Sequence, residues 1–547
     1  MRRRPVRFGG PFFLVSAATA AGAGGCVDDA YWLALSPGHP MLRPLLFVPL
    51  LLAPALMTAQ PAPKVPKAIA AIRQADLERD LYVMGGDAMR GREAGTIDEM
   101  HATIWIADQM AKIGLQPRGD MGSWFQWWNM RRTRISTTAS SVQLAGRPLA
   151  LWTEITPTTN AAADVAGPSF FLPDPRDTTV DVRGRIVVTP LLPPAPSAIR
   201  TTTNTPDYNY TRAALGPLGT GLARRGALAV IVVADSVAER AFDGIAVVQA
   251  RGAYDVVGGV PRFVRAAAAT PGAGRPAAPP PQIPVLLAHR AALAVWRPDG
   301  QTVDIRLRTE TFEYPSANVI GVVRGTDPRL RDEYVLFSSH QDHDGVRYVV
   351  DGDSIWNGAD DNATTSVALL AIARAWKRQP SRRSALFVFH GAEERGLLGS
   401  RYHAAHPVVP LANIVAVLNG DMLGRNNPDT AALLGSQPPH RNSAALVDMA
   451  IAANRATSRF VIDSLWDRPT HPEGWYFRSD HVPYAERNVP ALFFSTNLHQ
   501  DYHTPRDEPK TIDYVKLARV ARWMYMTGWI AANAETRPAV DPGFVLR

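Results

Sequence analysis

The sequence of 547 residues is long for a single hydrophobic core, so its length predicts two or more domains. It has 58 lysines and arginines against 50 acidic residues, a formal net charge of +8, and five of the arginines lie within the first 43 residues. No cluster of basic residues is interleaved with aromatic residues, which argues against nucleic-acid binding.

Residues 41–59 have the pattern of a signal peptide, with an early arginine, an apolar core and a small residue, Ala59, at the end. The apolar run is too short and too interrupted by proline for a good membrane span. On this interpretation residues 1–40 are an upstream extension. A competing signal sequence covers residues 1–26 and ends at a lipoprotein-like Cys26. The sequence therefore predicts export, either to the periplasm or out of the cell.

Cys26 is the only cysteine of the chain. Cleavage after Ala59 removes it, which excludes disulfides and thiol catalysis in the mature protein. We then expect stability after export to depend on packing and on bound metal.

Residues 68–145 form the first part of a predicted α/β domain. Residues 101–113 are amphipathic and stop before a Gly-Leu-Gln-Pro segment, which predicts a helix. Residues 124–128 contain four aromatic side chains. They cover an edge of the core or line a substrate pocket, and the sequence leaves both interpretations open.

Residues 150–304 are rich in Pro, Thr and Ala and differ in character from the rest of the chain. Short β-like runs occur at residues 184–189, 227–234 and 282–287, with a helix-like stretch at 219–226. The composition of residues 266–281 predicts a flexible loop. Because no cluster of histidines or acidic residues occurs here, we expect this region to shape substrate access or to act as a structural lid, without catalytic residues.

Four short apolar runs, typical of buried parallel strands, occur in residues 305–535, at 334–339, 385–389, 414–418 and 489–494. Between the first two, residues 361–376 show helical spacing, and Asn362 is the expected N-cap. A last helix at residues 511–532 has Asp513 in its first turn, where the helix dipole favours an acid. This alternation predicts an α/β fold with a mixed, mostly parallel sheet flanked by helices.

Imidazoles and carboxylates follow these strands, just past their C-terminal ends, where open α/β sheets build their sites. They supply two imidazoles, a carboxylate able to bridge, two further carboxylates and a spare glutamate. Two metal ions about 3.5–4 Å apart need such a mixture of ligands, so the set predicts hydrolysis by a water held between two metals. The motifs are His340-Gln341-Asp342, Gly358-Ala359-Asp360-Asp361-Asn362, Ala392-Glu393-Glu394, Asn419-Gly420-Asp421 and Tyr502-His503-Thr504.

These motifs, in this order, resemble the co-catalytic zinc aminopeptidase family, which includes bacterial leucyl aminopeptidases and glutamate carboxypeptidases. The resemblance covers residues 68–145 and 305–535, and residues 87–96 resemble a loop of that family. The stretches that begin at Asp181 and Leu222 resemble a protease-associated domain, a small β-rich module often inserted in this family. The resemblance therefore implies a zinc exopeptidase fold with residues 150–304 as an inserted β-rich domain.

The same resemblance implies two Zn²⁺ ions per chain. One would be held by His340, Asp361 and Asp421, and the other by Asp361, Glu394 and His503, with Asp361 as the bridge. Cobalt or manganese occupies similar oxygen-rich sites in other proteins, so the sequence leaves the metal open.

The resemblance also implies roles for neighbouring residues. Glu393 would be the general base. Asp342 would bond the far nitrogen of His340 and fix its tautomer. Tyr502 is a candidate donor to the tetrahedral oxyanion. The peptide joining Asp361 to Asn362 is often cis in this family.

Other polar residues have more ordinary interpretations. We expect Asp360 to bond near the metals without binding them, and Asp480 to be structural or to bind substrate. Five further histidines are expected on the surface or outside the coordination sphere; they are His343, His390, His471, His481 and His499.

The sequence thus predicts an exported zinc aminopeptidase acting on peptides with a free N-terminus, with no nucleic-acid partner and no stable membrane span. A carboxypeptidase or dipeptidase with the same chemistry is the first alternative, with Arg425 and Arg478 as candidates to bind the substrate carboxylate. A second is a metal- or peptide-binding relative without turnover, against which the intact Glu393 argues. A glutaminyl cyclase is a further relative, but such enzymes usually use one zinc.

Overall fold

The structure, a computed structural model, describes residues 63–199, 205–260, 282–294 and 300–546. Residues 61–547 form one compact unit. Both predicted signal sequences, Cys26 and the predicted loop 266–281 lie outside the described residues, so these remain predictions.

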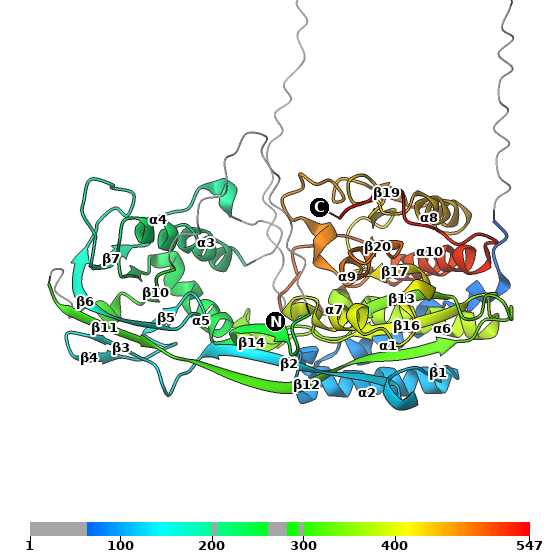
Figure 1. The fold of residues 1–547 in the computed structure, drawn as a ribbon, viewed down its shortest axis with the longest axis horizontal. Helices are drawn as coiled ribbons and strands as arrows, with labels where there is room; N and C mark the ends of the chain where they lie inside the picture. The colour runs from blue at the N-terminus through cyan, green and yellow to red at the C-terminus, as the bar shows by residue number, and fades with distance from the viewer. Residues whose placement is uncertain (1–62, 200–204, 261–281, 295–299, 547) are drawn as a thin grey trace, which may run out of the picture. The chain divides into compact units, whose positions relative to one another are not determined.

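The first sheet has ten strands and is parallel at its centre (Figure 1). Strands β16, β13, β17 and β20 pair in parallel, whereas β12, β2 and β9 add antiparallel strands on one side and β18 and β19 extend the other. In sheet order the strands are β19 (Val461–Asp463), β18 (Thr430–Leu434), β20 (Ala491–Ser495), β17 (Ile414–Gly420), β13 (Tyr334–His340), β16 (Ser384–His390), β12 (Thr309–Val323), β2 (Phe125–Ile135) and β9 (Ala253–Val256), with β1 (Gln116–Pro117) beside β12. The predicted mixed α/β fold is confirmed, and its four strand predictions match β13, β16, β17 and β20.

Helices cover both faces of this sheet, as strand alternation requires. Phe337 and Phe387 pack in the larger core cluster, whereas Leu336 and Leu386, one residue earlier, pack in a separate cluster on the opposite face. The larger cluster includes α1 (Gln74–Met84), α2 (Ile97–Ile113), α6 (Thr365–Arg378), α8 (Ala444–Ala456) and α10 (Tyr514–Asn533). The smaller includes α7 (Leu398–Ala405) and α9 (Val482–Ala485).

The predicted helices are present, but their first residues differ in part. Helix α2 ends at Ile113, and its C-cap Gly114 has a left-handed φ of 86° that suits glycine. Asp513 is the N-cap of α10, where its carboxylate accepts the N–H of Lys516. The N-cap prediction for Asn362 is wrong, because α6 begins only at Thr365 and the Asn362 amide donates to the Gly420 carbonyl. The Asp361–Asn362 peptide is cis, as the resemblance implied.

A second sheet of eight strands is built from residues 141–307. In sheet order it contains β4 (Arg147–Leu149), β3 (Ser141–Leu144), β11 (Thr302–Leu307), β6 (Ala163–Phe171), β7 (Ile186–Pro190), β8 (Ala229–Val233), β10 (Val285–Ala288) and β5 (Ile155–Pro157). The predicted runs correspond to β7, β8 and β10, and the helix-like stretch corresponds to α4 (Leu218–Arg224). The expected β-rich region also contains α3 (Pro206–Leu215) and α5 (Ser236–Arg251), which the sequence analysis did not predict.

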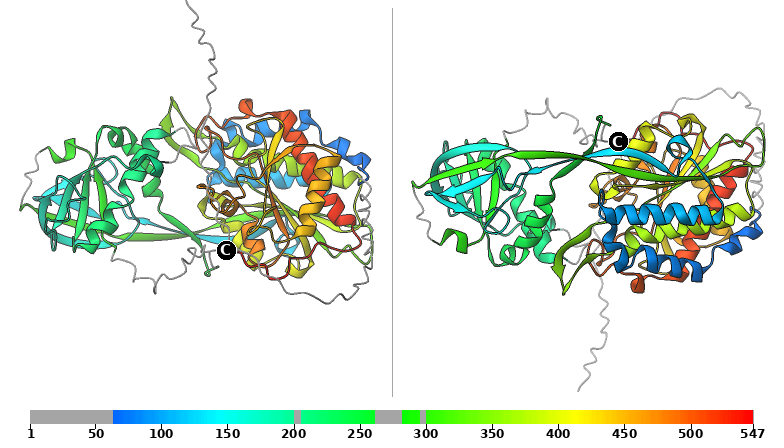
Figure 2. Two further views of the ribbon diagram at one scale, coloured as in Figure 1. Left: turned by 90° about the horizontal axis from the view of Figure 1, so that it is seen from above. Right: turned by 90° about the horizontal axis from the view of Figure 1, so that it is seen from below.

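Two long strands connect the sheets. β2 and β12 pair antiparallel from Thr309↔Ile135 to Val319↔Phe125, and they can be followed side by side in Figure 2. β2 leads into β3, and β11 leads into β12. β9, which follows α5, pairs with β2 in the first sheet, so part of the region 150–304 is bound to that sheet. Its status as an inserted protease-associated domain remains a prediction.

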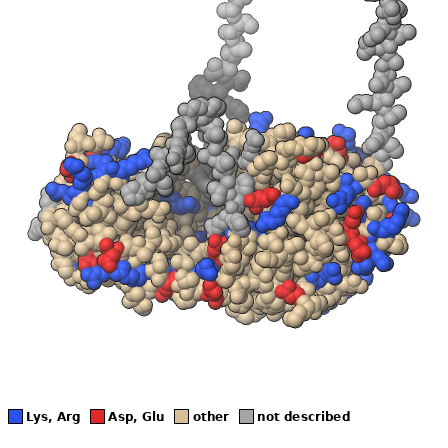
Figure 3. Space-filling view, in the orientation of Figure 1, with Lys and Arg blue, Asp and Glu red and all other residues tan. Residues whose placement is uncertain are grey.

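On the face drawn in Figure 3, basic and acidic side chains are interspersed. Of the helices in the described ranges, none has the length and apolar character that crossing a bilayer demands.

A small hairpin, β14 (Gly345–Val350) with β15 (Asp353–Trp356), follows β13.

The fully buried Arg92 ties this hairpin region to the helical layer. Its guanidinium donates to the carbonyls of Gln341, Met84, Asn357 and Gly358 at 2.7–2.9 Å. These bonds join segments that local sequence patterns do not connect.

We predict that Arg92→Leu lowers the free energy of unfolding by on the order of 3 kcal/mol, because it leaves several buried carbonyls without donors. Urea denaturation followed by circular dichroism measures this change. Arg90→Leu is the matched control, since Arg90 is exposed and its one ion pair among the described residues is with Asp98, at 3.4 Å. Equal stability of the two variants would contradict the role given to Arg92.

Candidate metal centre

The candidate centre lies where three neighbouring parallel strands end. His340 ends β13 and is in register with His390, the last residue of β16. The chain leaving β16 carries Glu393 and Glu394, and Asp421 directly follows β17. Two groups of donor atoms, each within 4.8 Å of one another, form at this edge: His340, Asp361 and Asp421, and His343, Asp361, Glu394 and His503.

The structure therefore brings together all five residues that the family resemblance implied as ligands. Asp361 belongs to both groups, and its two oxygens face different histidines. Oδ1 lies 3.2 Å from His340 Nε2, and Oδ2 lies 3.1 Å from His503 Nε2. This is the arrangement that a bridging carboxylate requires.

The other donors complete each group. In the first, Asp421 Oδ2 lies 3.5 Å from His340 Nε2 and accepts a hydrogen bond from the Ser479 hydroxyl at 2.8 Å. In the second, Glu394 Oε1 lies 3.1 Å from His503 Nε2 and 2.8 Å from His343 Nδ1.

Several buried donor atoms in these groups have no hydrogen-bond partner among the described residues. They include His340 Nε2, Glu394 Oε1 and Asp421 Oδ1. Burial raises the pKa of Asp421 to about 6, and the pKa of Glu393 well above its ordinary value. Divalent cations bind imidazole nitrogen and carboxylate oxygen, so a cation at each group would satisfy these atoms and stabilise the charged carboxylates. The donor set fits such ions.

The predicted contact between Asp342 and the far nitrogen of His340 is present, and it is made by the main chain. His340 Nδ1 lies 3.1 Å from the backbone carbonyl of Asp342, whereas the carboxylate is 3.8 Å away. That carboxylate instead accepts the backbone N–H groups of Glu393 at 2.9 Å and Glu394 at 3.2 Å. Asp342 thus orients the imidazole through its main chain and the two glutamates through its side chain.

Asp360 lies outside both donor groups, as expected, and shapes the loop beside them. Its carboxylate accepts the Gly424 N–H at 2.7 Å. Asp507, which the sequence analysis did not single out, accepts the backbone N–H of Asp360 at 2.9 Å and that of Asp361 at 3.1 Å. Asp507 therefore fixes the backbone that carries the shared carboxylate.

Tyr502 lies beside the second group. Its ring stacks on His503 with centroids 3.9 Å apart, and its hydroxyl accepts a bond from Arg478 at 2.8 Å. Burial raises its pKa well above the ordinary value, so the hydroxyl keeps its proton. A cavity of about 340 Å³ opens here, and its lining includes Arg478, Tyr502, His503 and Glu394.

The remaining predicted residues belong to neither donor group. Arg425 bonds Asp501 at 2.6 Å and Thr511 at 2.7 Å, so its guanidinium is held by neighbours. Asp480 is fully buried. Of residues 124–128, Trp128 is buried against Tyr402, which supports the interpretation as a core edge. His390, His481 and His499 are buried outside both groups, and His471 is half-buried.

His343 is a candidate donor that the sequence analysis did not select. It was expected on the surface or outside the coordination sphere, but it is fully buried with its donor atom in the second group. Its place one residue after Asp342, and three residues after the end of β13 at His340, is the signal that was present in the sequence.

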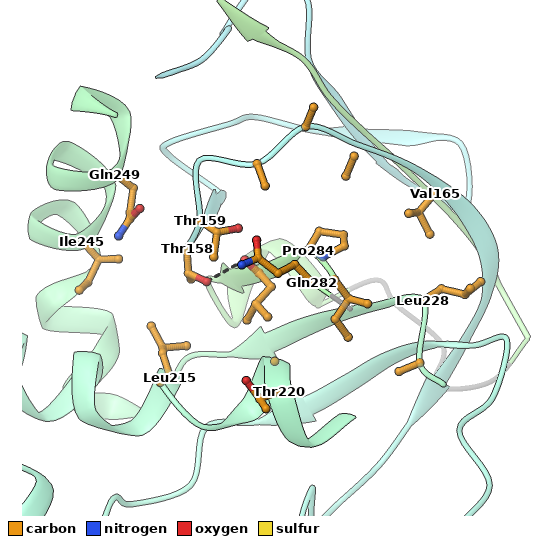
Figure 4. A pocket seen from close by; sticks show the side chains of 18 of the residues that line it. Thr158, Thr159, Val165, Leu215, Thr220, Leu228, Ile245, Gln249, Gln282 and Pro284 are labelled. Atoms are coloured by element: carbon orange, nitrogen blue, oxygen red, sulfur yellow. Dashed lines mark hydrogen bonds between the residues drawn. The ribbon is translucent and has the colours of Figure 1, made fainter. Parts of the chain in front are cut away.

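The second sheet contains a larger cavity, of about 790 Å³, which Figure 4 shows from close by. Thr158, Thr220, Gln249 and Leu215 are among the side chains around it, and Thr158 donates to the Val285 carbonyl at 2.9 Å. Among the residues that the structure describes, its lining includes no histidine and no acidic residue. That residues 150–304 contribute no catalytic group remains a prediction.

Comparison with known proteins identifies the relatives of this chain. Residues 318–527 match the model described as peptidase family M28. Aminopeptidase YwaD of Bacillus subtilis is 24% identical over 273 residues, which are 47% of this chain and 56% of that relative. BSAP, a zinc aminopeptidase from Bacillus subtilis, has a similar structure, with a TM-score of 0.51, 18% identity, and coverage of 88% of this chain and 100% of that chain. The aminopeptidase from Aneurinibacillus sp. strain AM-1 gives a TM-score of 0.50, 16% identity, and coverage of 87% and 97%.

The resemblance to zinc aminopeptidases is thereby confirmed at the level of the family. At these identities the solved structures show the fold alone. The chain matches 56% of the length of YwaD, a little over half of that relative.

We predict that Asp507→Asn weakens zinc binding by about 10–100-fold, because one of its carboxylate acceptors is replaced by a donor beside the Asp361 backbone. Competition with a coloured chelator measures the affinity. Glu508→Gln is the matched control, since Glu508 pairs with the exposed Lys510. Unchanged affinity in Asp507→Asn would contradict its positioning role.

Proposed function

We propose that this chain, through its M28 region, is an exported zinc aminopeptidase that hydrolyses the N-terminal peptide bond of peptides. The observation that carries the proposal is the shared Asp361 carboxylate, with Oδ1 3.2 Å from His340 and Oδ2 3.1 Å from His503. Two donor groups joined by one carboxylate suit a pair of ions a few ångströms apart.

Five side chains would hold the metals: His340, Asp361 and Asp421 for one ion, and Asp361, Glu394 and His503 for the other. Bound zinc supplies Lewis-acid chemistry and lowers the pKa of water. The charge of the cluster supports this assignment. Burial lowers the pKa of His503, but the carboxylates of Glu394 and Asp344 outweigh burial and raise this pKa to about 10. The raised pKa shows that the surrounding carboxylates favour a positive charge at His503, and the same carboxylates favour a bound cation there.

Glu393 is the proposed general base. It is buried, its Oε2 lies 3.8 Å from His340 Nε2, and its backbone is fixed by Asp342. Burial, together with the Glu394 and Asp421 carboxylates, raises its pKa, which strengthens it as a proton acceptor. Glu393 takes a proton from the attacking water at its carboxylate oxygen and gives it to the leaving amine.

Tyr502 is the proposed donor to the oxyanion of the tetrahedral intermediate. Arg478 donates to the phenolic oxygen at 2.8 Å, so the oxygen's own proton can point elsewhere. The guanidinium also polarises the hydroxyl and makes it a stronger donor.

The carboxypeptidase alternative requires a basic group available for the substrate carboxylate. Arg478 lines the cavity, but it bonds Glu473 at 2.8 Å and Tyr502 at 2.8 Å. Arg425 bonds Asp501 and Thr511. These contacts, and the aminopeptidase names of the relatives, favour recognition of a free amine near the acidic groups.

Aminoacyl-p-nitroanilides, assayed beside the same compounds with acetylated amines, test the proposal. We expect cleavage of the free-amine set alone, loss of activity with a chelator, and recovery with added zinc. Cleavage only of substrates with a free C-terminal carboxylate would favour the carboxypeptidase. Metal binding without any turnover would favour the non-catalytic relative.

We predict that Glu393→Gln lowers kcat by about 1,000-fold while leaving zinc content unchanged, because the amide cannot accept the proton. Steady-state kinetics and metal analysis of the same preparation measure both quantities. Glu473→Gln is a control at the cavity, where the paired Arg478 remains. A Glu393→Gln variant with nearly full kcat would rule out the general-base role.

We predict that Tyr502→Phe lowers kcat about 100-fold with little change in KM, since the hydroxyl acts on the oxyanion and not on the ground state. Kinetics at saturating substrate measure this change. Full kcat in this variant would assign oxyanion stabilisation to other groups.

A further inference from the structure

His343 lies beside the second donor group but is absent from the five-ligand set. We propose that His343 is a direct ligand of the metal centre, a third imidazole that binds together with Asp361, Glu394 and His503. The inference rests on the proposed metal centre, but it does not depend on peptide hydrolysis.

The first support is distance. His343 Nδ1 lies 2.8 Å from Glu394 Oε1 and 3.9 Å from Asp361 Oδ2. His503 Nε2 lies 3.1 Å from each of the same two oxygens. Donors bound at about 2.0–2.2 Å to one tetrahedral ion are about 3.3–3.6 Å apart. The four observed spacings, from 2.8 to 3.9 Å, lie on both sides of this range, so the four donors surround a space of the size that one ion needs.

The second support is that the buried ring nitrogens of His343 lack hydrogen-bond partners among the described residues. His343 is fully buried, and neither of its ring nitrogens has a hydrogen-bond partner among the described residues. The 2.8 Å contact with Glu394 Oε1 lacks the direction of a hydrogen bond, and that oxygen is also without a partner. A buried imidazole without hydrogen-bond partners lowers the stability of the fold. A cation bound by His343 Nδ1 and Glu394 Oε1 gives both atoms a partner.

The third support is that the ring is held in place. A Cβ added to Gly358 would lie 2.3 Å from Cγ and 2.4 Å from Cδ2 of His343, so the imidazole lies directly against the glycine backbone. The His343 N–H donates to the Arg92 carbonyl at 3.2 Å, and the Arg92 guanidinium donates to the Gly358 carbonyl at 2.9 Å. The imidazole is therefore positioned before any ion binds, as a ligand should be.

The competing interpretation is that His343 only donates a hydrogen bond to Glu394 and orients it. A positioning histidine of this kind also affects metal affinity, by about 10–100-fold. Affinity alone does not separate the two interpretations, so the test needs a signal that arises only from a bond to the metal.

Direct coordination also changes the metal preference. With His343 the second group offers two nitrogens and two carboxylates, whereas the first offers one nitrogen and two carboxylates. Imidazole-rich groups favour zinc, cobalt and copper over manganese and magnesium. We therefore expect the second group to fill first when cobalt is titrated into the metal-free protein.

The decisive experiment uses the full chain, stripped of metal and refilled with Co²⁺, with the substitution His343→Cys. A ligating thiolate gives a sulfur-to-cobalt charge-transfer absorption in the near ultraviolet, and a cysteine outside the coordination sphere does not. We expect this band in His343→Cys. We expect no band in the unmutated chain, whose only cysteine is Cys26, or in the control His403→Cys. His403 is equally buried, contacts Tyr484 and lies outside both donor groups.

A second measurement needs no variant to fold. In the cobalt-loaded unmutated protein, each ligating imidazole gives one exchangeable, hyperfine-shifted N–H proton signal. The proposal expects three such signals, from His340, His343 and His503. Two signals with both ions bound, or a folded, cobalt-loaded His343→Cys variant without the band, would overturn it. A chain that binds no cobalt would instead overturn the metal centre and the proposed function together.

Discussion

The parallel pairing of β13 with β16 and β17 is the constraint on which the candidate centre depends. All residues of these three strands are buried, so their side chains pack in the core, and the candidate metal ligands His340, Glu394 and Asp421 lie at or just past the strand ends. Because His340 is in register with His390, the chain leaving β16 delivers Glu393 and Glu394 beside the last residue of β13. The end of β17 adds Asp421 at the same edge. The chemistry is thereby confined to one edge of the sheet.

This concentration of acidic groups is stable only with nearby positive charge. Burial raises the pKa of Asp421 and of Glu393, because both charged forms lose hydration. The nearby arginines pair with other carboxylates: Arg478 bonds Glu473, and Arg395 contacts Glu93 and Asp344. Divalent ions are the cations that the remaining donor atoms fit, and their binding would couple the order of this edge to the stability of the fold.

The sequence predicted those features that are encoded locally, such as an apolar run that ends in a donor residue. Features set by distant partners were not predictable in this way. Asparagine is favoured at helix N-caps, but the side-chain amide of Asn362 donates to the carbonyl of Gly420, 58 residues away. Asp507 supports Asp361 across 146 residues. The Asp342 motif is visible in the sequence, yet whether its side chain or its main chain meets His340 depends on the turn after β13. The buried position of His343 likewise depends on Gly358.

The two donor groups differ in solvent exposure, and this difference explains what the additional imidazole of His343 contributes to metal binding. The side chains of His340 and Asp421 are almost completely buried, whereas His503 is 25% exposed at the cavity. Water reaches the second group more readily and competes for the ion, which favours its loss. An added neutral nitrogen strengthens binding there without adding negative charge to an edge that already holds several carboxylates. The second group can then stay open to substrate on the side of His503 while His343 holds the ion from the buried side.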